Sequence, residues 1–188
     1  TVIFRVPNDP VLYVKQMYWL PADNLDKKII QDKVPYDDWV REDYLRLSDG
    51  NKVNYKDVTK WLLEVQNEYG IYIYKGGYDR ALSTYIIDEI IDTFGKNIAM
   101  PVAQGGFTFN IPMRTFSADL EKGLINYGSN PITLWNLANA SVTIDSNNNM
   151  YLCKTHDDTK RIDGVASMLD AFIVYLNEQN NYMSMINM

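Results

Sequence analysis

The chain has 188 residues, and its 18 lysines and arginines stand against 24 aspartates and glutamates, a formal net charge of −6. This balance argues against a nucleic-acid-binding module that depends on net positive charge alone. The one cysteine, Cys153, and the one histidine, His156, exclude a disulfide framework within the chain and zinc sites built from several cysteines or two histidines. Because no apolar run approaches the roughly 18 residues that cross a bilayer, we expect no membrane segment here and a reduced, cytosolic setting.

The first third of the chain is predicted to form a β-hairpin followed by a long polar segment. Residues 1–6 alternate in polarity and are rich in β-branched side chains, and residues 11–20 are rich in valine, tyrosine and tryptophan. Proline, asparagine and aspartate between them favour a turn, so the two strands should pair. Residues 21–58 are charged and irregular, which predicts a functional loop or short helices.

Helices and strands alternate through the rest of the chain. Apolar side chains at helical spacing and short apolar runs between turn residues define the elements. The pattern predicts helices over 58–69, 82–94, 112–127 and 162–177, strands over 71–74 and 98–102, and a hairpin of 141–145 with 150–154. Residues 178–188 are expected to form a flexible tail. The alternation indicates a single α/β domain over 1–188, with a mixed sheet flanked by helices.

Two common kinds of catalytic site are disfavoured. The paired glycines at 76–77 and 105–106 lack the lysine and hydroxyl residue of a phosphate-binding loop and the spacing of a dinucleotide site, so we expect no nucleotide in this chain. A nucleophilic cysteine needs an activating base. His156 follows the strand that carries Cys153 in a charged loop, where we expect it to face solvent.

Carboxylates offer the remaining chemistry, because oxygen ligands suit Mg²⁺ and related cations. Asp79 follows a predicted strand, where it could bind a metal or cap the next helix, and spacing alone favours the cap. Asp163 begins the last helix. It could bind a metal ion, or it could simply place a favourable negative charge at the start of the helix. A glycine in the first turn, such as Gly164, destabilises a helix by about 1 kcal/mol relative to alanine. A close approach by DNA or a metal ion would explain why glycine stands there. Asp170 lies on the same helical face as Asp163. It is either a solvated surface residue or an additional metal ligand held in reserve.

Three cations near Asp163 are candidates for DNA contacts. Lys154, Lys160 and Arg161 precede it in the chain and could meet phosphate groups. The alternative is that they are ordinary surface charges.

The segment 162–172 resembles the final helix of a known family, the C-terminal nuclease domain of the tailed-bacteriophage terminase large subunit. Further segments similar to that family, in the same order, are Val34-Pro35-Tyr36 with Trp39, Tyr78-Asp79-Arg80-Ala81, Val102-Ala103-Gln104-Gly105, and Asn130-Pro131 through Trp135 to Asn139-Ala140. A ribonuclease H-like recombinase is a weaker match, because it would leave the Gln104-Gly105 segment and the Asn130-Pro131 to Trp135 segment unexplained.

The resemblance implies a ribonuclease H-like fold with an added β-hairpin, and a Mg²⁺- or Mn²⁺-dependent endonuclease that uses two metal ions. The family holds its metals with three carboxylates; Asp79 matches the second and Asp163 the third, with Asp170 in reserve. The first lies on a strand just before the one that opens at Thr1. We therefore expect that strand to be missing, the chain to be a fragment, and its isolated activity to be weak or absent.

The same resemblance implies the partners. These are concatemeric double-stranded viral DNA, the N-terminal ATPase domain of the same protein, the portal and the small terminase subunit, in the cytoplasm of the bacterial host. The alternative is a non-catalytic module that docks DNA or the portal on a ribonuclease H-like fold. Exposed aromatic side chains and residues 21–58 would then matter most.

Overall fold

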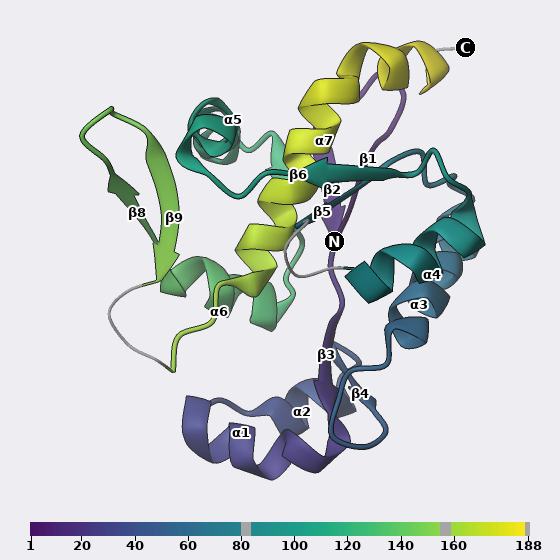
Figure 1. Cartoon of the computed structure of the whole chain (residues 1–188), viewed down its shortest axis with the longest axis vertical. Coiled ribbons are helices and arrows are strands. Elements are labelled where there is room, and N and C mark those ends of the chain that lie inside the picture. The colour runs from purple at the N-terminus through teal and green to yellow at the C-terminus, as the bar shows by residue number, and fades with distance from the viewer. Residues whose placement is uncertain (80–83, 155–158, 187–188) are drawn as a thin grey trace.

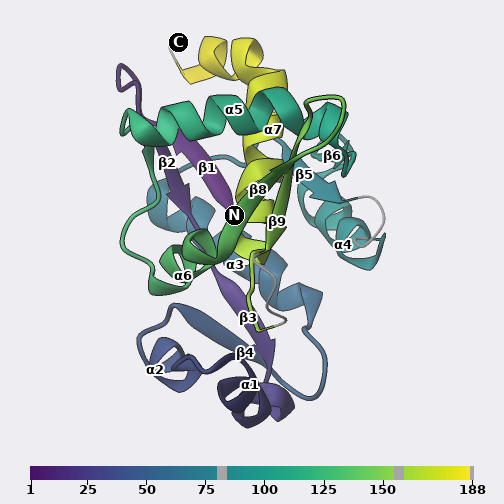
Figure 2. The same ribbon diagram turned by 90° about the vertical axis from the view of Figure 1, so that its left-hand side faces the viewer.

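The structure is a computed structural model in which residues 1–79, 84–154 and 159–186 are described. Helix α7 runs through the molecule; α5 and the β8–β9 hairpin lie to one side of it, and α3 and α4 to the other (Figure 1). A smaller group of α1, α2, β3 and β4 lies below the start of α7 (Figures 1 and 2). In chain order the elements are β1 (Val2–Arg5), β2 (Leu12–Lys15), β3 (Tyr18–Pro21), η1 (Ala22–Asn24), α1 (Leu25–Asp32), α2 (Tyr36–Arg41), β4 (Leu45–Ser48), α3 (Tyr55–Tyr69), β5 (Gly76–Asp79), α4 (Thr84–Phe94), β6 (Ala99–Val102), α5 (Gly106–Glu121), β7 (Ile125–Asn126), α6 (Pro131–Asn139), β8 (Ala140–Ile144), β9 (Met150–Lys154) and α7 (Asp163–Ile186).

The mixed α/β architecture is confirmed, but the described strands form several small sheets. β1 and β2 make the predicted antiparallel hairpin, and β7 extends it in parallel beside β2. The predicted strand over 11–20 is interrupted, because β3 turns away and pairs in parallel with β4. Gln16 lies at this break, and its side chain is buried. Its amide donates a hydrogen bond to the main-chain oxygen of Gly164 in α7, a partner of the kind that a buried amide requires.

Short helices occupy the segment 21–58, as predicted. α1 and α2 are held by an aromatic cluster in which the Tyr36 ring meets Trp39 at 5.3 Å and Trp135 at 6.1 Å between centroids. Both contacts are edge-to-face, the favourable geometry for aromatic pairs. Because Trp135 belongs to α6, the cluster attaches this group of elements to the rest of the molecule.

The strand predicted over 71–74 is wrong: the strand in this region is β5, which pairs in parallel with β6. The reason is the close contact of β5 with α7. A Cβ atom at Gly77 would lie 2.7 Å from Val174 Cγ2 and 2.9 Å from the Asp170 carbonyl oxygen, so only glycine fits. The apolar pattern pointed to the neighbouring residues, which line a groove instead.

The prediction for residues 112–127 is wrong at both ends. α5 begins earlier, at Gly106, and carries Pro112 within its first turns. It ends at Glu121, beyond which Gly123 adopts a left-handed φ of 68°. α6, which the apolar pattern did not predict, begins where the Asn130 side chain accepts hydrogen bonds from the main chain of the next residues.

The final helix extends beyond its predicted end. Where a flexible tail was expected, residues 178–186 continue α7, and the Tyr182 hydroxyl accepts a hydrogen bond from the Arg5 amide. The inner face of α7 supplies much of the core, and the predicted β8–β9 hairpin is confirmed. Among the described helices, none combines the length and apolar character needed to cross a bilayer. The core around α7 comprises Leu12, Val14, Val102, Phe109, Met113, Phe116, Ile125, Val165, Met168, Leu169, Phe172, Ile173 and Val174.

Candidate functional site

One face of α7 carries three polar side chains in its first turns. Asp163, Ser167 and Asp170 are spaced so that they lie on the same side of the helix. Asp163 is exposed, while Ser167 and Asp170 are half-buried. The Ser167 hydroxyl lies 2.8 Å from the hydroxyl of Thr1, so the chain entering β1 passes α7 between the two carboxylates.

Asp79 and Asp170 interact at the edge where β5 and β6 end. These strands are parallel, so the residues that follow them meet at one edge of the sheet. Burial raises the pKa of the Asp170 carboxyl, and the Asp79 charge raises it further, although Gln104 Nε2 donates a hydrogen bond to it at 3.0 Å. The like charge of Asp79 and the burial of Asp170 thus both disfavour the ionised form of Asp170. The start of the next helix, where Asp79 could be a cap, lies outside the described residues.

The charge of Asp163 acts on the buried hydroxyl of Tyr18. Burial raises the pKa of Tyr18 to about 12, and the Asp163 charge contributes to the same shift. A Cβ atom at Gly164 would collide with the Tyr18 ring and hydroxyl. The glycine therefore makes room for Tyr18, which corrects the suggestion from the sequence that DNA or a metal ion required it.

Arg161, two residues before Asp163, forms a bidentate ion pair. Its guanidinium donates to both oxygens of Asp32, at 3.0 and 2.7 Å, and Tyr36 donates to the same carboxylate at 2.9 Å. Burial alone would raise the pKa of Asp32, but the hydrogen bonds from Arg161 and Tyr36 outweigh it and lower the pKa below its usual value. The Asp32 side chain is completely buried. The pair thus fixes the segment before α7 to α1.

This ion pair predicts an acid-dependent stability. Because the folded-state pKa of Asp32 lies below the unfolded value of 3.8, the contribution is fully present above that pH and is lost as pH falls below it. Breaking a fully buried pair costs about 3–5 kcal/mol. Because the Arg161 side chain is 27% exposed, Asp32→Asn should lower the free energy of unfolding by about 2–3 kcal/mol at pH 7 and by much less in acid. Urea unfolding at several pH values measures this. The exposed pair Asp38–Arg41 supplies a control, since Asp38→Asn should cost less than about 1 kcal/mol; equal losses would contradict the prediction.

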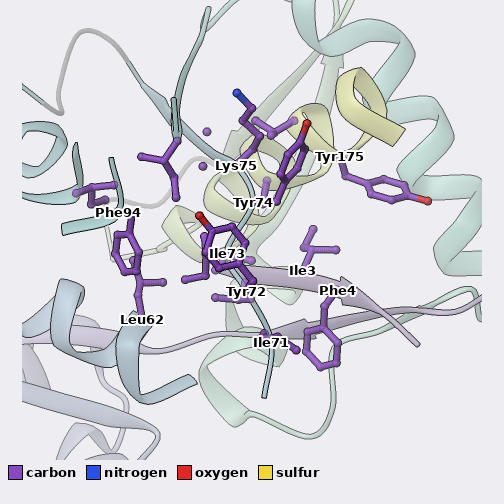
Figure 3. Close-up of a pocket in the computed structure, with 18 of the residues that line it drawn as sticks. Ile3, Phe4, Leu62, Ile71, Tyr72, Ile73, Tyr74, Lys75, Phe94 and Tyr175 are labelled. Atoms are coloured by element: carbon purple, nitrogen blue, oxygen red, sulfur yellow. The ribbon is translucent and has the colours of Figure 1, made fainter. Parts of the chain in front are cut away.

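A groove separates the β1–β2 and β5–β6 sheets. Its volume is ≈ 550 Å³. Mostly apolar side chains from β1, α3, the 71–75 segment, α4 and α7 surround it (Figure 3). Among the described residues, β1 has no strand partner on the side away from β2, and β5 has none on the side away from β6. The buried Trp19 indole N–H, on the lining of the groove, has no hydrogen-bond partner in the described part of the chain.

The structure brings together some of the predicted site residues. Asp79 joins Asp170, and Asp163 lies on the same helical face as Asp170, but within residues 1–79, 84–154 and 159–186 no group of three or more histidine, cysteine or acidic residues could hold a metal ion. Lys154 is exposed at the end of β9, and Lys160 is half-buried before α7. His156 lies outside the described residues.

Several residues that hold the start of α7 from other elements were not predicted as site residues. Gln16, Asn136 and Asn139 hydrogen-bond to the main chain there, and Asp32 pairs with Arg161. No local pattern marks such residues, because their partners lie far along the chain. The similarity of segment 130–140 to the terminase family was the one signal that pointed to this region.

The comparison with known proteins decides the family. The family described as "Terminase large subunit, endonuclease domain" matches residues 1–179. The chain belongs to this family. The large terminase subunit of Enterobacteria phage HK97 is 28% identical over 171 residues, which covers 89% of this chain and 32% of that protein. The crystal structure of the HK97 bacteriophage large terminase matches with a TM-score of 0.79 and 25% identity, over 89% of this chain and 34% of that one.

Membership of the terminase nuclease family confirms the resemblance predicted from the five segments. It implies a hydrolase of the endonuclease class. This chain spans about a third of the length of the relatives that it matches.

Proposed function

We propose that this chain is the catalytic part of a metal-dependent endonuclease that cuts concatemeric double-stranded DNA. The observation that carries the proposal is the packing of β5, which ends at Asp79, against α7 at Asp170, on the helical face that also bears Asp163. Acidic side chains from a strand end and a helix start supply the oxygen ligands that Mg²⁺ and Mn²⁺ prefer.

The donor set fits these cations, since it contains carboxylates and no cysteine or histidine. Asp79 and Asp163 would hold the ions, with Asp170 as an additional ligand that Gln104 orients. Bound ions would supply charge stabilisation for the attacking water and the leaving oxygen of a hydrolysed phosphodiester bond.

The groove between β1 and β5 supports a place for the first carboxylate. A strand preceding Thr1 would meet the open edges of β1 and β5, and a main-chain carbonyl could accept the Trp19 N–H. It would join the two sheets into the mixed sheet of a ribonuclease H-like fold. The Thr1 hydroxyl lies 2.8 Å from that of Ser167, on the same face of α7 as Asp163 and Asp170.

The wider assembly is part of the same proposal. We infer an N-terminal ATPase domain in the same protein, together with the portal and the small terminase subunit, in the host cytoplasm. Lys154 and Lys160 are proposed to contact DNA phosphates; Arg161 was proposed with them, but its guanidinium is already bound bidentately by Asp32.

A cutting assay with two lengths of the protein tests the proposal. With Mn²⁺, a longer protein that carries the preceding strand should cut plasmid DNA, while the 188-residue chain should cut at least about tenfold more slowly, because losing a carboxylate weakens metal binding. Each protein is first checked for cooperative unfolding. A longer, folded protein that fails to cut at any Mn²⁺ concentration would contradict the nuclease proposal.

A docking module that does not cut DNA is the second candidate. It is favoured by the Phe107 and Ile111 side chains on α5, which are 96% and 72% exposed. Contiguous exposed apolar side chains often mark interaction surfaces. If the longer protein binds DNA or the portal but has no metal-dependent cutting, docking becomes the better account.

A further inference from the structure

The main chain on both sides of Asp163 is held by side chains of α6. Asn136 Oδ1 accepts the Gly164 N–H at 3.0 Å, and Asn139 Nδ2 donates to the Arg161 carbonyl oxygen at 3.1 Å. Asn136 is itself held, because its Nδ2 donates to a carbonyl within α6 at 2.9 Å. The peptide group that follows Asp163, and the peptide group between Arg161 and Ile162, are therefore tied to one helix.

The segment between β2 and β3 holds the same turn from another direction. Gln16 Nε2 donates to the Gly164 carbonyl oxygen at 2.8 Å, and Gln16 Oε1 accepts hydrogen bonds from Thr133 and Tyr18 at 2.8 and 3.1 Å. The Gln16 bond to Gly164 and the Asn136 bond to the same residue are both buried. Buried bonds of this kind are not exchanged for water without a cost.

The start of α7 lacks a cap of the usual kind. The first N–H groups of a helix have no partner within the helix, and a serine, threonine, aspartate or asparagine just before it normally accepts one. Here the preceding residue is Ile162, which has no acceptor in its side chain. Asn136, from a different helix, takes that role, and the half-buried Arg161–Asp32 pair fixes the approach to the helix.

We propose that Asn136, Asn139, Gln16 and the Arg161–Asp32 pair are positioning residues that fix the direction of the Asp163 carboxylate for metal binding. The inference rests on the proposed function. None of the five hydrogen-bonds to the carboxylate of Asp163 in the structure: Asn136 and Gln16 bond to Gly164, Asn139 bonds to the Arg161 carbonyl, and Asp32 bonds to the Arg161 side chain. They act by removing the main-chain freedom that would otherwise be lost when an ion binds.

The test measures Mn²⁺ binding and cutting separately in the longer protein. Asn136→Ala should raise the dissociation constant for Mn²⁺, measured directly by electron paramagnetic resonance of the free ion, by about threefold to tenfold, less than the roughly 10–100-fold that follows the loss of a residue bonded directly to a metal ligand. It should speed amide hydrogen exchange at Gly164. The Mn²⁺ concentration for half-maximal cutting should rise in parallel, while the rate at saturating Mn²⁺ should change much less.

Asn54→Ala is the matched control. Asn54 caps α3 by accepting the Lys56 N–H, so its loss costs a comparable stability of about 1 kcal/mol without touching α7. Its Mn²⁺ affinity should equal that of the wild-type protein. Arg161→Lys is the second variant, since it keeps the charge but loses the planar fork, and it should also weaken Mn²⁺ binding.

The outcomes separate this inference from the proposed function. If Asp163→Asn retains wild-type Mn²⁺ affinity, the proposed function fails. If Asp163→Asn loses Mn²⁺ but folded Asn136→Ala and Arg161→Lys bind it as the wild-type protein does, only the positioning role is overturned. Should Asn136→Ala prove unfolded, Arg161→Lys decides the question alone.

Discussion

Asp163→Asn is expected to lower Mn²⁺-dependent cutting by the longer protein more than about a hundredfold. Loss of residues that merely orient metal ligands typically costs 10–100-fold, and the loss of a ligand charge should exceed that. The fold should not change, because Asp163 is exposed and the bonds from Gln16 and Asn136 go to the Gly164 main chain. Plasmid cutting and thermal unfolding of the variant measure the two quantities.

Asp26→Asn is the matched control for this substitution. Asp26 is likewise an exposed aspartate in the first turn of a helix, α1, far along the chain from Asp79 and Asp170. It should leave cutting and stability within experimental error, since exposed substitutions usually change stability by less than about 0.5 kcal/mol. A folded Asp163→Asn protein that cuts like the wild type would remove Asp163 from the metal site.

Gly77→Ala is expected to destabilise the protein by about 1–3 kcal/mol, the range for forcing extra volume into a packed contact. The added Cβ would lie 2.7 Å from Val174 Cγ2 and 2.9 Å from the Asp170 carbonyl oxygen, so β5 and α7 must separate. That movement shifts Asp79 relative to Asp170. Cutting by the longer protein should therefore fall even at temperatures where the variant is fully folded.

Gly76→Ala, one residue away on the same strand, is the matched control. The nearest atom to its new Cβ is the Ile98 carbonyl oxygen at 4.0 Å, an ordinary contact. Neither glycine has a left-handed φ, so backbone strain does not distinguish the two variants. Urea unfolding of both measures the difference, and equal losses of stability would show that the close contact of β5 with α7 is not what excludes a side chain there.

Local patterns predicted those elements whose own residues define them. The alternating hairpins and α3, with its asparagine cap and its left-handed Gly70, were found in this way. β5 was misplaced because its position is set by the fit of Gly77 against α7, a tertiary contact. α5 was misplaced because it contains Pro112 in its interior, a residue that usually marks the start or the end of a helix.

The metal-binding roles of Asp79 and Asp163 stay predictions, which rest on charge and on the family resemblance. The Arg161–Asp32 pair joins residues 129 positions apart, and the Gln16–Gly164 bond joins residues 148 apart. Such pairs leave no local trace in the sequence, so only the folded structure could reveal what holds Asp163 in place.

The most direct test of the central claim is the position of a bound ion. Crystals of the longer protein, soaked in millimolar Mn²⁺, should show an anomalous peak coordinated by carboxylate oxygens of Asp79 and Asp163. The peak should be absent from the Asp163→Asn protein under the same conditions. A wild-type structure with no ion near Asp79 and Asp163 at that concentration would contradict the account.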